Sequence, residues 1–68
     1  MNEKLAKQNI LRLDIKDNII NKLKDNQISK IGELCSKSEV DLRNFNLDSI
    51  EIESIKNELQ QIGMILRN

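Results

Sequence analysis

The chain has 68 residues, enough for one small domain that buries roughly 60% of the surface its unfolded form exposes. Hydrophobic residues make up 38% and charged residues 32%, a balance typical of folded proteins and too apolar for intrinsic disorder. There is no histidine and Cys35 is the single cysteine, which excludes a catalytic triad and a zinc site of the Cys/His kind. We therefore expect no enzyme, no metal, no cofactor and no small-molecule substrate.

Eleven basic and eleven acidic residues cancel, but the two signs are unevenly distributed. Residues 1–37 carry eight basic against five acidic residues, a net charge of +3. Residues 38–68 carry three basic against six acidic residues, a net charge of −3. Any contact with phosphate should therefore involve the first half, although solvated helix faces explain most of these charges.

The longest unbroken apolar run, Met64 to Leu66, is far shorter than the ~20 residues that span a bilayer. The N-terminal segment lacks the apolar stretch of a secretion signal, and one cysteine cannot form a disulfide within the chain. These features predict a cytoplasmic protein without a membrane helix.

Residues 1–12 form a lead-in whose sparse apolar residues suit either a short helix or a mobile segment. Leu13 and Ile15 alternate with charged residues, which predicts an extended segment over the core. Asp17 is expected to cap a first helix that ends at Asp25 and Asn26. In this helix Lys22 and Lys24 should face outward, opposite an inner side formed by Ile19, Ile20 and Leu23.

Ser29 is expected to cap a second short helix with Ile31, Leu34 and Cys35 on its buried side. This position favours a packed Cys35 over a redox-sensing thiol. Gly32 lies within the helix at a cost of about 1 kcal/mol relative to alanine. A close approach by the backbone of a neighbouring helix would explain that glycine.

Ser38 and Asp41 form a capping-box pattern that predicts the start of a third helix. Its expected apolar side consists of Val40, Leu42 and Phe45. The ring of Phe45 is expected to pack in the core rather than to stack on a nucleic-acid base. A tight connection over residues 44–47 should follow.

Asp48 and Glu51 form a second capping box, in which each side chain accepts a hydrogen bond from the other residue's amide. Gly63 supplies the left-handed residue that commonly ends a helix. Between them an apolar stripe repeats at helical spacing, formed by Ile52, Ile55, Leu59 and Ile62. Residues 64–66 should fold back over the core.

The sequence therefore predicts an all-α fold, a compact bundle of four to five short helices that ends in a helix-hairpin-helix. The expected core consists of Ile20, Leu23, Ile31, Leu34, Leu42, Ile52, Ile55 and Leu59.

Over about residues 13–66 the chain resembles the C-terminal domain of the bacterial RNA polymerase α subunit. The order and spacing of several segments carry this likeness, with one residue missing between Leu42 and Asn46. The matching segments are Leu13-Asp14-Ile15, Asn21 to Lys24, Ile31 to Leu34, Ser38 to Leu42, Asn46-Leu47, and Ile55-Lys56 with Leu59 and Gly63.

The resemblance implies a domain over residues 13–68 that binds A/T-rich DNA in the minor groove and docks sigma factors and regulators on other faces. The positions that it marks for DNA binding, together with nearby polar residues, are Asn18, Asn21, Lys22, Asn46 and Ser49. Asp14 corresponds to an acidic position used towards sigma, and Lys24 to a basic position used towards regulators.

Four residue differences from the family weaken the DNA binding that the resemblance implies. The family's groove-entering arginine falls on Asn18, which cannot exploit the negative potential of a narrow minor groove. The family's phosphate-approaching glycine falls on Asp48, its lysine falls on Ile50, and its serine falls on Glu51.

We expect a monomeric transcription-associated module that docks on polymerase, sigma or a regulator and binds A/T-rich duplex weakly. The alternative is a protein-interaction module that keeps the fold without binding DNA.

Overall fold

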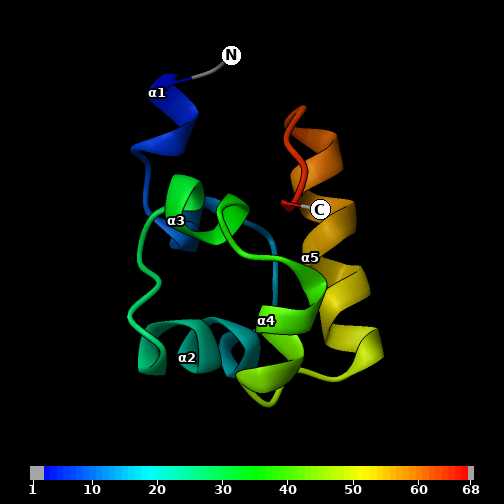
Figure 1. Ribbon diagram of the computed structural model, residues 1–68. Helices are drawn as coiled ribbons and strands as arrows, with labels where there is room; N and C mark the ends of the chain where they lie inside the picture. Colours follow the sequence, from blue (N-terminus) through cyan, green and yellow to red (C-terminus); the bar gives the residue numbers. More distant parts are fainter. Residues whose placement is uncertain (1–2, 68) are drawn as a thin grey trace.

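In the computed structural model, which describes residues 3–67, the regular elements are all helical (Figure 1). They are α1 (Glu3–Ala6), the 3₁₀ helix η1 (Ile10–Arg12), α2 (Asp17–Asp25), α3 (Ile31–Cys35), α4 (Glu39–Asn44) and α5 (Ser49–Gln61). The predicted all-α fold of short helices ending in a helix-hairpin-helix is confirmed, with α4 and α5 as the final pair. Within the described residues, no helix is both long and apolar enough to cross a membrane.

Both predicted capping boxes are present. The amide of Glu51 donates to Asp48 Oδ1 at 2.8 Å, and the amide of Asp48 donates to Glu51 Oε1 at 3.0 Å. At the start of α4, the amide of Ser38 donates to Asp41 Oδ2 at 3.0 Å, and the amide of Asp41 donates back to Ser38 Oγ at 3.3 Å. These side chains satisfy amides that the first helical turn leaves unpaired.

The other two predicted caps are wrong by one residue. Lys16 holds the cap position of α2, and Asp17 is the first helical residue, where its charge favours the positive end of the helix dipole. Lys30 holds the cap position of α3. Ser29 contributes as a donor, since its amide and hydroxyl both donate to Glu33 Oε1, at 2.9 and 3.1 Å. These bonds hold the pKa of the Glu33 carboxyl below its ordinary value, the amide of Ser29 contributing most.

Three helices end in the same way, with a left-handed residue followed by an apolar one. The left-handed residues have positive φ angles of 64°, 68° and 78° and are Gln27, Asn46 and Gly63. The next amide donates to the carbonyl five residues earlier, in the pairs Ile28 to Leu23, Leu47 to Leu42 and Met64 to Leu59. This is the Schellman motif, which satisfies carbonyls left free at a helix end. Of the three left-handed residues, only Gly63 was predicted.

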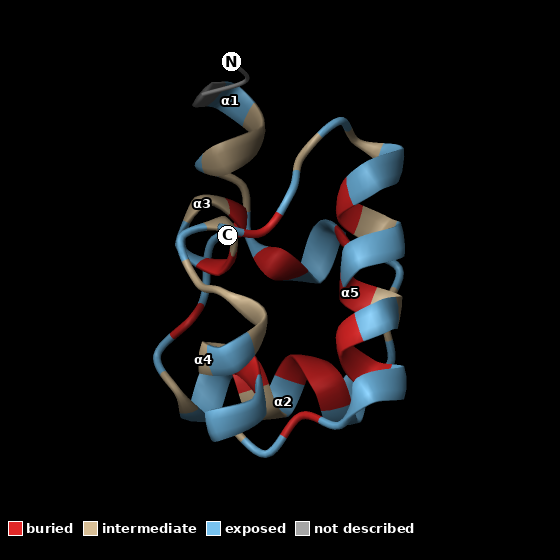
Figure 2. Cartoon of the chain, turned by 45° about the vertical axis from the view of Figure 1, so that its right-hand side comes forward, coloured by how far each residue is buried: buried red, intermediate tan, exposed pale blue. Residues whose placement is uncertain are grey.

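The core lies where the inner faces of α2 and α5 meet the shorter helices (Figure 2). All eight predicted core residues are buried. They are joined by Ile10, Leu13, Ile19, Ile28, Leu47 and Leu66. Ile10 belongs to the lead-in but packs in the same cluster as the residues of the expected domain. Val40 contradicts its assignment to the apolar side of α4, since 64% of it is exposed. Cys35, Phe45 and Ile62 are half-buried against the core.

The close approach predicted at Gly32 is confirmed, and the neighbour is α1. A Cβ atom at Gly32 would lie 3.0 Å from the carbonyl oxygen of Ala6 and 3.1 Å from its Cβ. The amide of Ile31 donates to the Gln8 carbonyl at 2.9 Å, which fastens the lead-in to the start of α3. The described lead-in therefore contains two short helices and packs through Ala6 and Ile10, whereas residues 1–2 lie outside the described range.

Both predicted non-helical segments are confirmed in outline. Leu13 is buried and Ile15 half-buried in an extended segment that pairs with no strand in the described range. The C-terminal tail folds back, since Leu66 is buried and the amide of Arg67 donates to the Cys35 carbonyl at 3.0 Å. Ile65 departs from the prediction because it points outward, 75% exposed.

Candidate functional site

The carboxylate of Glu51 is the centre of a polar network between α2 and the start of α5. Its Oε1 accepts hydrogen bonds from Lys22 Nζ at 2.9 Å and from the Asp48 amide at 3.0 Å. Its Oε2 accepts from Lys22 Nζ at 3.1 Å and from Asn18 Nδ2 at 3.2 Å. Only 11% of the Glu51 side chain is exposed, so this acid is held inside the fold.

Lys22 is the cation of this network, and it does not face freely outward as predicted. Its Nζ donates to the carbonyl of Asn46 at 2.9 Å as well as to both oxygens of Glu51. An ammonium group has three N–H donors, and three acceptors lie within hydrogen-bond distance here. The ion pair with Glu51 therefore directs the charge of Lys22 towards the protein rather than towards solvent.

The five predicted DNA-binding residues fall into two groups. The structure brings together Asn18, Lys22 and the backbone of Asn46 around Glu51. Asn21 and Ser49 are exposed, one on α2 and the other as the first residue of α5. Asn46 also has a structural reason to be asparagine, because it occupies the left-handed position at the end of α4.

The charge of this surface is unfavourable for DNA. Lys22, Asp48 and Glu51 together carry a net charge of −1. Asp48 is exposed, and Ile50 beside it is an apolar side chain with 79% exposure. Neither of these two exposed side chains can neutralise the charge of a phosphate.

The two predicted docking residues lie outside this network. Asp14 is exposed in the extended segment, and its amide donates to Glu58 Oε1 of α5 at 3.0 Å. Lys24 is exposed in the last turn of α2. Both side chains are therefore placed where a protein partner can reach them.

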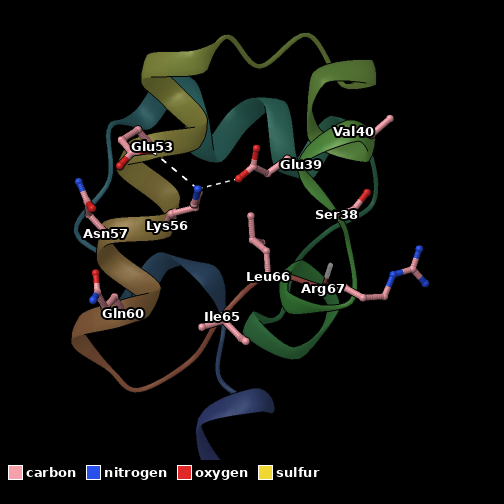
Figure 3. A pocket seen from close by; sticks show the side chains of 10 residues that line it. All are labelled: Ser38, Glu39, Val40, Glu53, Lys56, Asn57, Gln60, Ile65, Leu66 and Arg67. Atoms are coloured by element: carbon pink, nitrogen blue, oxygen red, sulfur yellow. Dashed lines mark hydrogen bonds and ion pairs between the residues drawn. The ribbon is translucent and has the colours of Figure 1, made fainter.

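A groove of about 540 Å³ between α4, α5 and the C-terminal tail was not predicted (Figure 3). On one side Lys56 Nζ lies 2.6 Å from Glu39 Oε1 and 4.0 Å from Glu53 Oε2. Glu39 raises the pKa of Lys56, and Lys56 lowers that of Glu39. The exposed apolar side chains of Val40 and Ile65 line the same groove. The apolar pattern of the sequence had assigned both side chains to the interior, so it did not predict this groove.

In the part of the chain that the structure describes, no group of three or more His, Cys, Asp or Glu side chains is placed to hold a metal ion. Burial raises the pKa of the half-buried Cys35 thiol, which disfavours the reactive thiolate. No protein-family model matches the chain.

Proposed function

We propose that this chain is a cytoplasmic, transcription-associated helical module that docks on proteins and binds A/T-rich duplex DNA weakly. Its link to transcription rests on the resemblance of residues 13–66 to the C-terminal domain of the polymerase α subunit. The observation that supports weak binding to DNA is the ion pair between Lys22 and Glu51.

This ion pair matters because the affinity of proteins for duplex DNA depends mainly on neutralising phosphates with lysine and arginine. On the surface that the resemblance marks for DNA, Lys22 is already bound to the Glu51 carboxylate. The side-chain amide of Asn18 donates a hydrogen bond to that carboxylate as well. Asp48 adds an exposed negative charge at the start of α5. Each of these features lowers the attraction of a phosphate backbone for this face.

The second candidate function, a protein-interaction module that does not contact DNA at all, is favoured by the groove beside α4. Exposed Val40 and Ile65 offer apolar contacts beside charged residues, as the surfaces of protein partners commonly do. The two functions share protein docking and differ only in whether any residual affinity for DNA remains.

The proposal is tested by binding of the immobilised chain to purified RNA polymerase core and, separately, to purified sigma factor. We expect saturable binding to at least one of them. Asp14→Asn should weaken binding to sigma by roughly tenfold, equivalent to about 1.4 kcal/mol. The matched control is Asp25→Asn, which makes the same charge change at another exposed position. The absence of binding to both proteins would overturn the proposal.

A further inference from the structure

The groove between α4, α5 and the C-terminal tail has an acidic side and a basic side (Figure 3). Glu53 lies on the α5 side, with 64% of its side chain exposed. Arg67 lies on the opposite side, in the tail, with 67% of its side chain exposed. The tail places Leu66 between these two charges and the exposed side chain of Ile65 at the edge of the groove. Opposite charges therefore lie on the two sides of an apolar centre.

Neither of these two charges is closely paired within residues 3–67. Lys56 Nζ lies 4.0 Å from Glu53 Oε2 but only 2.6 Å from Glu39 Oε1, to which it donates a hydrogen bond. Arg67 likewise lies 4.0 Å from Asp41 Oδ2. Ion pairs between exposed side chains contribute little to stability, and least where the two charges are far apart. Glu53 and Arg67 are therefore available to bind opposite charges from outside the chain.

A second copy of the chain carries the pattern of charges that matches this groove. Two copies related by a two-fold axis use the same surface on both sides, so a pair of residues that meets across the interface meets twice. A surface with an acid on one side and a base on the other is complementary to itself under such an axis. A partner of uniform charge would instead meet a like charge on one side of the groove, which is unfavourable.

We propose that the groove is the interface of a weak symmetric dimer of this chain, in which Glu53 of each copy pairs with Arg67 of the other. The apolar contacts come from Val40 and Ile65, whose exposed side chains become covered in the dimer. This inference goes beyond the proposed function, because it involves neither polymerase, nor sigma, nor DNA.

The dimer is weak because its apolar contact is small. Two exposed aliphatic side chains in each copy supply much less surface than the roughly 1,600 Å² of a standard interface. We therefore expect a dissociation constant of about 10⁻⁴ M, weaker than the micromolar to picomolar values of standard-size interfaces. The monomer expected from the sequence is then the form that the chain takes at lower concentrations.

The test is self-association of the full chain, measured by sedimentation equilibrium at concentrations on both sides of about 10⁻⁴ M. Glu53→Arg makes both sides of the groove positive, and Arg67→Glu makes both sides negative. Each variant alone should dimerise about tenfold more weakly than the unmodified chain, because like charges then face each other twice. An equimolar mixture of the two variants should dimerise as well as the unmodified chain, since a positive groove meets a negative one.

The matched controls are Asp25→Arg and Arg12→Glu, which make the same changes in net charge at exposed positions that do not line the groove. Both should dimerise like the unmodified chain. Circular dichroism should show that all the variants remain helical. A measurement without substitutions is the salt dependence. Raising the salt to about 1 M shortens the screening length to ~3 Å and should weaken the dimer of the unmodified chain.

Recovery of the dimer in the mixture would support the inference, since a loss of stability in either variant cannot produce it. The inference is wrong if the unmodified chain is monomeric at every concentration, if each reversal dimerises like it, or if the mixture associates no better than its components. The groove would then be open to a different protein. Docking to polymerase or sigma is measured with those proteins, so either proposal can fail without the other.

Discussion

Replacing Ile55 with alanine is expected to destabilise the chain by about 2–5 kcal/mol, the usual cost of truncating a buried aliphatic side chain. Ile55 is completely buried at the middle of the inner face of α5. A chain of 68 residues has a thin core, so this loss is a large share of its total stability. Urea unfolding followed by circular dichroism measures the change.

Ile50→Ala provides the matched control, because it makes the same chemical change on the same helix at an exposed position. It should change the free energy of unfolding by no more than about 0.5 kcal/mol. If Ile55→Ala has an effect as small as this control, the stripe on α5 does not form the core.

Introducing the residue types of the resembled family should give the chain a preference for A/T-rich DNA, provided that Glu51 is neutralised as well. Asn18→Arg, Asp48→Gly and Ile50→Lys together raise the net charge by three. With Glu51 retained, however, an arginine at position 18 would meet a carboxylate that lies 3.2 Å from Asn18 Nδ2. We therefore expect the triple variant to gain only non-specific affinity, whereas adding Glu51→Gln should allow the arginine to enter a minor groove.

The measurement is anisotropy with an A/T-rich and a G/C-rich duplex, because minor-groove width and potential differ between them. We expect the quadruple variant, with all four substitutions, to prefer the A/T-rich duplex by roughly tenfold, about 1.4 kcal/mol. Asp48→Gly weakens the cap of α5 by only a few tenths of a kcal/mol, so the fold should survive. If the quadruple variant is helical and binds both duplexes equally, the residue correspondence with the family is wrong.

Local signals in the sequence were enough to predict most of the fold. A capping box needs only two residues three positions apart, and both boxes appear where Ser38 and Asp48 indicate. Helical spacing likewise places Ile52, Ile55 and Leu59 on one buried face. The isolated Gly32 predicted a close helix approach, although not that α1 would make it.

The candidate site was less predictable because its central contact joins residues 29 positions apart. Glu51 has a complete local explanation as a cap, and nothing in its neighbourhood of the sequence indicates that Lys22 also binds it. Val40 was misplaced for a different reason. Residues two positions apart on an α-helix do not face the same side, so Val40 points away from the side on which Leu42 is buried. Gln27 has no sequence feature that signals a left-handed backbone.

The most direct measurement is the affinity of the unmodified chain for A/T-rich and G/C-rich duplexes at about 150 mM salt, near physiological ionic strength. If Lys22 and Asn18 are engaged by Glu51, both dissociation constants should be equal and no tighter than ~10⁻⁶ M, the tight end of the non-specific range. Submicromolar binding with a preference for the A/T-rich duplex would contradict the proposal that Glu51 holds Lys22 and Asn18 and so leaves the chain with only weak affinity for DNA.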